Sequence, residues 1–368
     1  MKKKLAFVDL TNFKDWPMGG MLQYELSILP YLCDHYDIDI WGVSVNGTKP
    51  QPLYINGKKY PVRVWTNVKT KRKLIPNFWR GLFLQKYIKE FEKYDGIYAH
   101  TATCLMPFFK LQKRGVKIFY HQHGLIYLKD PILKTKIQIP FMKKAQIKSN
   151  ITFIVSGPEL VKNYGSTLKR HGKFISIDSP VDSLGKTIYS KENNRFIYTG
   201  RITHFKGVPF LIDVFNAYLK EDPTAELTVV GDGDALPEVK KKIYKYGLKK
   251  KIHLMGKMSH DEVIDELVKN TIFVTASEGE GVSVSVAEAN VLGLPTVCLN
   301  VNGLNEQIVD GKNGIKAKNK TIEAMCTSMV NASKNWNKLH ESTLEFSKKY
   351  DSKRIANKII NNIDRELD

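Results

Sequence analysis

The sequence contains few cysteines and no long apolar run, and both shortages narrow the class of protein. The four cysteines are widely scattered without Cys-x-x-Cys spacing, so we predict reduced core residues in a cytoplasmic protein rather than disulfides or a zinc site: Cys33, Cys104, Cys298 and Cys326. No stretch of about 18 uncharged apolar residues occurs, so no transmembrane helix is predicted. Asp9 interrupts the apolar run that follows the N-terminal lysines. Residues 4–10 are therefore expected to form a first strand, not a signal peptide.

Acidic residues are also scarce relative to basic ones. The chain has 57 lysines and arginines against 37 aspartates and glutamates, a net charge of +20. Such an excess attracts nucleotide phosphates, an anionic membrane or nucleic acid, and charge alone does not choose among them. The length of 368 residues suits two domains, and a hydrophobic content of 42% is typical of a soluble globular protein.

A strand–helix–strand unit is predicted in the second half of the chain. Two short apolar runs, residues 271–276 and 296–299, have the length and β-branched content of buried strands. The Val-Ser-Val-Ser-Val alternation between them would also suit a half-buried strand, but Gly293 and Pro295 are typical of a helix end, so we interpret residues 283–292 as a helix. A βαβ unit implies a parallel sheet with ligands at the carboxyl ends of its strands.

Two carboxylates, Glu280 in the loop and Glu288 on the helix, lie in this unit with seven residues between them. The backbone N–H groups of Ser283 and Val284 open the helix and are expected to be unpaired donors that attract a phosphate. Glu280 could accept hydrogen bonds from sugar hydroxyls, and Glu288 could take both hydroxyls of a ribose. By spacing alone, two solvated surface glutamates remain the simpler interpretation.

The pattern Glu280-Gly281-x6-Glu288-Ala289-x3-Gly293-x-Pro295 resembles the E-x7-E signature of the retaining, GT-B-fold glycosyltransferases of family 4. The resemblance implies an α/β protein with two Rossmann-like domains that face a central cleft, and a C-terminal helix that returns to the N-terminal domain. It also implies that the first glutamate contacts the donor sugar and that the second holds the nucleotide ribose.

A second motif, Gly200-Arg201-x4-Lys206-Gly207, follows a predicted strand and precedes a predicted helix. Fixed cations and free amides converge there, which favours phosphate binding, although exposed basic residues are common in so basic a chain. The resemblance implies that Arg201 and Lys206 bind the donor phosphates. It further implies that Gly256 and Met258, after a later strand, contact the nucleotide base through their backbone.

The N-terminal half carries weaker matches. Gly19 and Gly20 resemble the family's glycine-rich loop, whose amides face the donor phosphate, but an isolated pair also suits a plain turn. The resemblance implies that His123 lies near the donor sugar and the acceptor, with a structural histidine as the alternative. His121 and His123 share a strand face, yet no carboxylate or cysteine is near them in sequence, so we do not predict zinc. Asp37-x-Asp39 looks like a metal-binding pair, but it begins a strand, and we interpret both as solvated positions.

A basic and aromatic segment runs from residue 69 to residue 84. Interleaved cations and aromatics suit binding to a membrane or to an acceptor, whereas a loop leading into a helix that packs on the core is the alternative. The residues concerned are Lys69, Lys71, Arg72, Lys73 and Trp79. We predict an acceptor domain over residues 1–182, a nucleotide-sugar domain over 183–350 and a returning helix over 351–368.

The resemblance implies that the protein is a hexosyltransferase. Arg201, Lys206 and the amides of Gly20, Ser283 and Val284 are expected to hold the departing diphosphate without a metal ion, so no cofactor is predicted beyond the nucleotide-sugar donor. The residues expected to be catalytic are His123, Glu280, Arg201 and Lys206.

The resemblance implies transfer of a sugar to a glycan hydroxyl with retention of the anomeric configuration. The expected donor is a UDP-sugar in preference to a GDP-sugar. The expected acceptor is a lipid-linked cell-surface polysaccharide, and the expected location is cytoplasmic, with peripheral contact to the inner membrane face. The alternatives are a nucleotide-sugar epimerase of the same fold and a basic nucleic-acid-binding protein, although no nucleic-acid-binding module is recognised.

Overall fold

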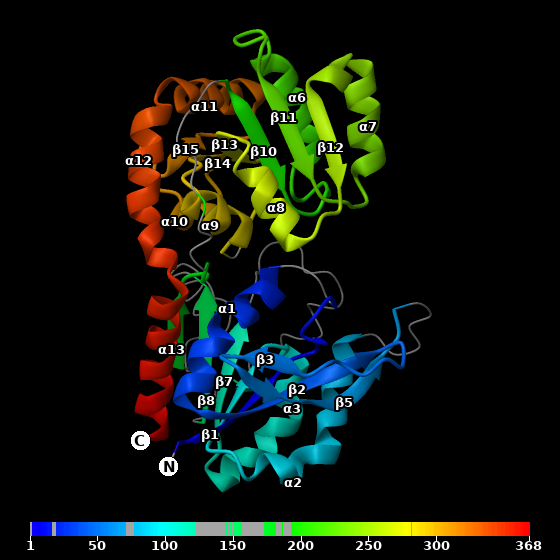
Figure 1. The fold of residues 1–368 in the computed structure, drawn as a ribbon, viewed down its shortest axis with the longest axis vertical. Coiled ribbons are helices and arrows are strands. Elements are labelled where there is room, and N and C mark those ends of the chain that lie inside the picture. Colours follow the sequence, from blue (N-terminus) through cyan, green and yellow to red (C-terminus); the bar gives the residue numbers. More distant parts are fainter. Residues whose placement is uncertain are drawn as a thin grey trace. The chain divides into compact units, whose positions relative to one another are not determined.

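The computed structural model describes residues 2–16, 20–70, 77–122, 144–145, 148, 150–156, 173–181, 186, 193–280 and 282–368. The chain divides into two compact units (Figure 1). The N-terminal unit comprises Met1–Pro180 with Ser352–Asp368, and the C-terminal unit comprises Val181–Asp351. The sequence predicts these limits at residues 182 and 350. Val181 donates its backbone N–H to the Tyr350 carbonyl at 2.8 Å, so the chain enters and leaves the C-terminal unit at neighbouring points.

The described strands of the N-terminal unit form a parallel sheet in the order β5-β2-β1-β6-β7-β8-β9. The order reverses between β1 and β6, as in a doubly wound fold. The strands are β1 (Lys4–Val8), β2 (Asp37–Val45), β5 (Val62–Val68), β6 (Gly96–Ala99), β7 (Lys117–Gln122), β8 (Ile151–Ser156) and β9 (Lys173–Ile177).

A hairpin of β3 (Leu53–Ile55) and β4 (Lys58–Tyr60) lies outside this sheet. Asn56 and Gly57 form its turn with φ angles of 49° and 75°, as their Asn-Gly pair predicts. The strand that follows, β5, does not extend the hairpin and instead pairs in parallel with β2.

In the N-terminal unit, a helix from the start of the chain packs against a helix from its end. The amphipathic α13 (Ser352–Leu367) buries Ile355, Ile359 and Ile363 and packs along α1 (Gly20–His35). The Tyr36 hydroxyl donates to Asp364 at 2.8 Å, which fastens the two. The predicted return of the C-terminal helix is thus confirmed. The remaining elements are η1 (Asn77–Tyr87), α2 (Ile88–Phe91), η2 (Ala102–Cys104), α3 (Leu105–Phe108) and η3 (Phe109–Arg114).

The C-terminal unit contains a parallel sheet with the order β12-β11-β10-β13-β14-β15 among the described strands. This is the Rossmann order, with its reversal between β10 and β13. The strands are β10 (Arg195–Thr199), β11 (Glu226–Val230), β12 (Ile252–Gly256), β13 (Ile272–Thr275), β14 (Thr296–Leu299) and β15 (Gly314–Ala317).

Helices join and cover these strands (Figure 1). The alternating segment after β13 forms a helix, α9 (Val284–Val291), so the helical interpretation is confirmed. The others are α6 (Val208–Tyr218), α7 (Leu236–Lys245), η4 (Leu248–Lys250), α8 (His260–Leu267), α10 (Leu304–Gln307), α11 (Ile322–Lys334), α12 (Trp336–Ser347) and η5 (Lys348–Tyr350).

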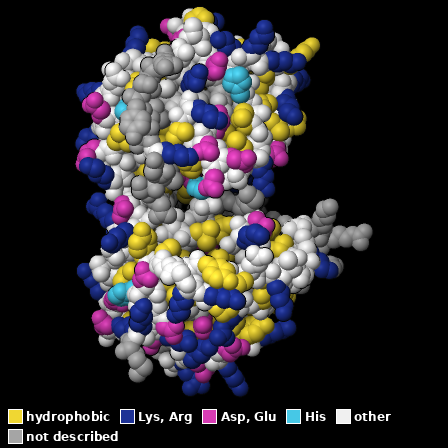
Figure 2. All heavy atoms as spheres, in the orientation of Figure 1, with side chains coloured by type: hydrophobic (Ala, Val, Ile, Leu, Met, Phe, Trp, Pro, Cys, Tyr) yellow, Lys and Arg dark blue, Asp and Glu magenta, His cyan; other side chains and the backbone are white. Residues whose placement is uncertain are grey.

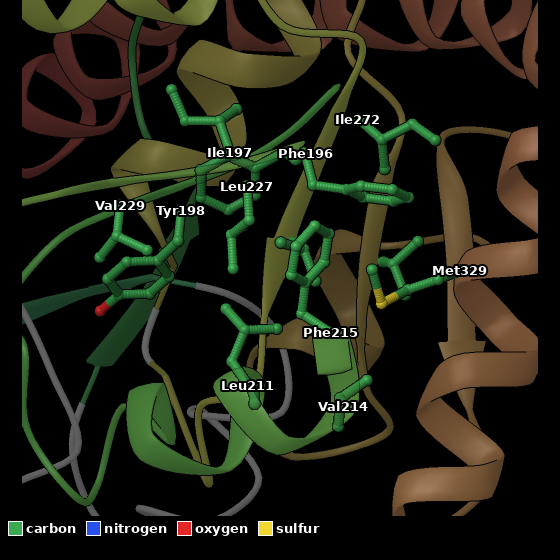
Figure 3. Packing of buried hydrophobic residues seen from close by; sticks show 14 of the residues in the cluster. Phe196, Ile197, Tyr198, Leu211, Val214, Phe215, Leu227, Val229, Ile272 and Met329 are labelled. Carbon is green, nitrogen blue, oxygen red and sulfur yellow. The ribbon is translucent and has the colours of Figure 1, made fainter. Parts of the chain in front are cut away.

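The core of the C-terminal unit is built on β10, whose side chains are buried on both faces of the sheet. Phe196 packs against Phe215 of α6 and lies near Met329 of α11, whereas Tyr198 lies beside Val229 of β11 (Figure 3). A strand that is apolar on both faces requires helices on both, because parallel sheets of this kind are covered on each side.

Two glycines draw the loops at one edge of this sheet together. Gly207 has a φ of 67°, and a Cβ there would lie 2.1 Å from the Ala276 carbonyl oxygen. Gly231 has a φ of 134°, and its Cβ would lie 1.9 Å from the Gly200 carbonyl oxygen. Only glycine allows both the positive φ and the close approach. The loops after β10, β11 and β13 therefore meet closely.

Candidate active site

The candidate site lies at the carboxyl ends of β10 and β13, where the strand order of the C-terminal sheet reverses. In open α/β sheets the loops leaving such neighbouring strands diverge and leave room for a ligand. The loop after β10 carries Arg201 and Lys206, and the loop after β13 carries Glu280. Tertiary structure thus brings the two sequence motifs to one place.

Lys206 and Glu280 form a close ion pair. The lysine Nζ lies 2.5 Å and 2.6 Å from the two carboxylate oxygens. Their side chains are 20% and 13% exposed, so both charges are largely removed from water. The Glu278 N–H donates to the Phe205 carbonyl at 3.0 Å, which ties the two loops together. Glu280 is therefore not the solvated surface residue that spacing alone suggested.

Arg201 adds a second cation to this loop. Its side chain is exposed, and no carboxylate within the described residues pairs with it. The Tyr198 hydroxyl donates to the Arg201 carbonyl at 2.8 Å, which holds the backbone of the loop. Burial and the nearby Glu280 charge raise the pKa of Tyr198, so its phenol stays neutral and acts as a donor.

The start of α9 differs from the prediction. The Ser283 N–H is not an unpaired donor, because it donates to Gln307 Oε1 at 2.9 Å, while Gln307 Nε2 donates to the Ser283 carbonyl at 2.7 Å. Ser283 Oγ also accepts from the Val286 N–H at 3.4 Å as the helix cap. A phosphate could reach the Ser283 amide only by displacing Gln307, whereas Val284 begins the helix as predicted.

Glu288 lies one turn further along α9 and is only 6% exposed. Its Oε1 lies 3.6 Å from Nδ1 of His260, at the start of α8. Burial raises the pKa of Glu288 to about 8. The simpler interpretation of Glu288 as a solvated surface residue is thus wrong. The sequence analysis did not single out His260, since nothing in its local pattern shows that α8 meets α9.

Gly256 and Met258 lie where β12 ends. Gly256 has a φ of 71° and accepts a hydrogen bond from the Gly231 N–H at 2.7 Å. Met258 is partly buried against the core. Ser259 then caps α8, its N–H donating to Glu262 at 2.7 Å. The predicted base-contacting segment therefore leads directly into the helix that carries His260.

Several predicted site residues lie outside the described residues: Gly19, Lys71, Arg72, Lys73, His123 and Gly281. Gly20 is described and begins α1 with an exposed position. Lys69 is exposed after β5, and Trp79 is half-buried in η1.

No group of His, Cys, Asp and Glu in the described ranges has the arrangement of a metal site. The prediction that Asp39 is a solvated position is wrong. Its carboxylate lies 3.4 Å from Arg63 and 3.5 Å from Lys93 and accepts a hydrogen bond from the Tyr94 hydroxyl at 2.5 Å.

No helix in the described part is long and apolar enough to cross a membrane. Lysines and arginines are spread over the visible face of both units, with acidic side chains among them (Figure 2).

The N-terminal unit contains a buried acidic cluster that the sequence analysis missed. Asp9, after β1, accepts from the Thr101 hydroxyl at 2.6 Å, and Glu25 of α1 lies 3.4 Å from Nδ1 of His100. Asp9, Glu25 and His100 are all buried. Burial raises the pKa of Asp9 to about 6 and, with the Asp9 charge, raises the pKa of Glu25 well above its usual value. The sequence feature that could have revealed this cluster is Glu25, a glutamate among the apolar residues of α1.

Comparison with known proteins bears on this geometry. Residues 185–349 match the family described as glycosyl transferases group 1. The C-terminal unit is a group 1 glycosyltransferase domain. An uncharacterized glycosyltransferase of Methanocaldococcus jannaschii is 26% identical, and the match covers 91% of each chain. An alpha-D-kanosaminyltransferase of Streptomyces kanamyceticus is 30% identical over 119 residues, which is 32% of this chain and 31% of that protein. Relatives that match over most of the chain are likewise named glycosyltransferases, so the chain is a transferase enzyme.

Solved structures agree on the fold. Sucrose-phosphate synthase from Thermosynechococcus elongatus superposes with a TM-score of 0.81 at 13% identity, covering 100% of this chain and 99% of that one. HepE from Anabaena, in complex with UDP-glucose, has a TM-score of 0.75 at 16% identity, covering 98% and 99%. The predicted GT-B class, with parallel sheets in two domains, is confirmed.

Proposed function

We propose that this group 1 glycosyltransferase transfers a hexose from a UDP-sugar to a hydroxyl of a glycan. The observation that carries the proposal is the Lys206–Glu280 pair beside Arg201 at the reversal point of the C-terminal sheet. A structural neighbour is in complex with UDP-glucose, which favours uracil as the donor base. The expected acceptor is lipid-linked, with the basic segment at residues 69–84 as its contact or as a membrane contact.

The leaving diphosphate gains negative charge as its bond to the anomeric carbon breaks. We propose that Arg201 and Lys206 stabilise that charge electrostatically. Lys206 is paired with Glu280, so donor binding would turn the ammonium from the carboxylate to the phosphate. Glu280 would then accept hydrogen bonds from the sugar hydroxyls, and Glu288 would hold the ribose.

Metal independence and retention of configuration are part of the same proposal. Two cations from this chain could supply the charge that a divalent ion supplies in other transferases. The family resemblance supports retention, with the departing phosphate as the base that takes the acceptor proton. Activity that vanishes in EDTA and returns with manganese, or a product of inverted anomeric configuration, would contradict these parts separately.

The central test is a panel of UDP- and GDP-sugars measured for thermal stabilisation, hydrolysis and transfer. A nucleotide present at about 100 times its Kd should stabilise the folded chain by about 2.7 kcal/mol. We expect stabilisation by UDP and slow hydrolysis of one UDP-sugar that accelerates when a glycan acceptor is added. Interconversion of the donor sugar without an acceptor would identify an epimerase instead, and stabilisation by nucleic acid alone would contradict the transferase proposal.

A further inference from the structure

Two helices bring one titratable pair to the ribose end of the proposed site. His260 is the first residue of α8, directly after the Gly256–Met258 segment, and Glu288 lies on α9. The imidazole Nδ1 and carboxylate Oε1 are 3.6 Å apart, and the side chains are 34% and 8% exposed. A small side-chain rotation would bring these atoms to hydrogen-bond distance. His260 is thus a partly exposed titratable group that lies next to a buried carboxyl group.

Few other charges face this pair. Among the described residues, no other basic group lies within ion-pair distance of Glu288. Asp261, next in sequence, acts on His260. Of the elements packed on α9, α12 carries His340, whose Nδ1 contacts the Gly293 carbonyl at 2.7 Å, and η5 carries Tyr350, which packs on Ala287. Burial is therefore what raises the pKa of Glu288, and His260 is the basic group nearest to its carboxyl group.

The Glu288–His260 pair is neutral near pH 7. Burial raises the pKa of Glu288 to about 8, and burial lowers the pKa of His260. The carboxyl group then keeps its proton while the imidazole has none. A ribose presents two hydroxyl donors, and an ionised carboxylate accepts both more strongly than a neutral carboxylic acid does. Binding a ribose thus favours loss of the Glu288 proton.

We propose that His260 is a positioning residue that takes the proton of Glu288 when the nucleotide ribose binds. The proton leaves the Glu288 carboxyl oxygen and binds the unprotonated imidazole nitrogen. The products are a carboxylate that accepts the two ribose hydroxyls and an imidazolium that faces it. No proton leaves the protein, and the two new charges are paired beside partly accessible solvent. This inference rests on the proposed function, because it requires a nucleotide at this end of the site.

The test measures proton release when UDP binds to the full chain. Calorimetric titrations at pH 7 in two buffers of different ionisation enthalpy give the number of protons released per UDP. In His260→Gln the amide cannot accept a proton, so Glu288 must release its proton to the buffer. We expect this variant to release about one proton more than the wild-type chain. Its UDP affinity should rise up to about tenfold per pH unit below pH 8, while that of the wild type stays flatter.

A matched control and a direct spectroscopic readout complete the experiment. His253 of β12 forms a similar pair with Glu226 of β11 at 3.5 Å, and both side chains are 42% exposed. The variant His253→Gln should therefore behave as the wild type does. Histidine NMR spectra of the wild type should show one imidazole becoming protonated when UDP is added, a signal that is absent in His260→Gln. The spectrum needs no variant to fold, so it decides the question even if His260→Gln is unstable.

The possible failures differ. A chain that binds neither UDP nor GDP contradicts the proposed function and this inference together. UDP binding without a newly protonated imidazole, or with equal proton release in the wild type and His260→Gln, contradicts the role of His260 alone. Binding of UDP and 2′-deoxy-UDP with equal affinity by the wild type would also overturn the inference, because no ribose contact would then draw the proton from Glu288.

Discussion

Lys206 and Glu280 carry opposite charges at the reversal point of the C-terminal sheet and form an ion pair there. Both side chains are mostly shielded from water, so the removal of one leaves the other poorly compensated. The pair therefore keeps the site compatible with folding before a ligand arrives. In the proposed reaction, a diphosphate would replace Glu280 as the anion at Lys206, and Glu280 would become free to bind the sugar.

Lys206→Ala and Glu280→Ala should each abolish sugar transfer and lower the stability, while the chain stays folded. Loss of one fixed donor to the leaving group typically lowers the rate on the order of 10²–10³. The measurement is kcat/KM for the UDP-sugar found in the panel, with circular dichroism for the fold. Lys320→Ala is the matched control, because Lys320 pairs with the exposed Glu278 nearby. Near-native turnover by folded Lys206→Ala would contradict the phosphate assignment.

The buried cluster of the N-terminal unit makes a prediction about pH. Burial raises the pKa of Asp9 to about 6 in the folded chain, above its usual value of 3.8. The folded state therefore binds more protons than the unfolded state between these values, and stability falls as the pH rises through that window. The shift corresponds to a penalty on the order of 3 kcal/mol once the pH exceeds 6.

Asp9→Asn should remove that penalty, since the asparagine carbonyl can still accept the Thr101 hydrogen bond. We expect a higher Tm than the wild type at pH 8 and a smaller difference between pH 5 and pH 8, measured by thermal unfolding. The exposed Asp37, at the start of β2, provides the control Asp37→Asn, whose Tm should follow the wild type at both pH values. An Asp9→Asn curve parallel to that of the wild type would rule out the proposed titration.

At the scale of elements, the loops after β10 and β13 depend on one tight contact. Gly207 has a φ of 67° and no room for a Cβ, because the Ala276 carbonyl oxygen would lie 2.1 Å away. Lys206 immediately precedes this glycine, and Ala276 precedes the loop that carries Glu280. The glycine therefore sets the distance between the two charged side chains as well as the start of α6.

Gly207→Ala should destabilise the C-terminal unit and lower activity together. A left-handed φ costs a residue with a Cβ about 1–2 kcal/mol, and the clash with Ala276 adds to that cost. Gly247→Ala separates the two effects, because Gly247 has a φ of 68° with nothing within 4 Å of its Cβ position. The expected result is a modest loss of Tm for Gly247→Ala and a larger loss, with reduced turnover, for Gly207→Ala. Equal losses would show that the clash with Ala276 is relieved at no cost.

The predicted elements agree with the structure where one local pattern was sufficient. Stop signals at Gly293 and Pro295 correctly favoured a helix for α9, and the Asn56-Gly57 pair correctly predicted a hairpin turn. The pairing of β5 with β2 cannot be predicted in this way, because alternation is the same whether a strand pairs with its neighbour in sequence or with a distant strand.

At the scale of the whole molecule, the net charge of +20 favours attraction to anionic partners larger than a single nucleotide. On the visible face, basic side chains are mixed with acidic ones over both units and do not form one continuous basic stripe (Figure 2). This distribution favours local contacts over a long nucleic-acid track. The basic segment that begins at Lys69 is the candidate for such a contact.

Replacing Lys69, Lys71, Arg72 and Lys73 by glutamine should weaken binding to anionic vesicles. A lysine or arginine near an anionic bilayer contributes about 1 kcal/mol, so affinity should fall by roughly two to three orders of magnitude. Sedimentation with vesicles containing phosphatidylglycerol provides the measurement. The control neutralises four exposed lysines of the C-terminal unit: Lys240, Lys241, Lys249 and Lys250. Equal losses in both variants would reduce the effect to general basicity.

Local patterns were enough to predict the class of fold, most strands and the charged residues that lie at the reversal point of the C-terminal sheet. Strand, turn and helix signals act over a few residues, and the carboxyl ends of parallel strands must share one edge. Three contacts needed the folded chain: Gln307 on the Ser283 amide, His260 beside Glu288, and Glu25 buried against His100. Each joins segments far apart in sequence, so it depends on strand order and helix packing, which no local pattern encodes.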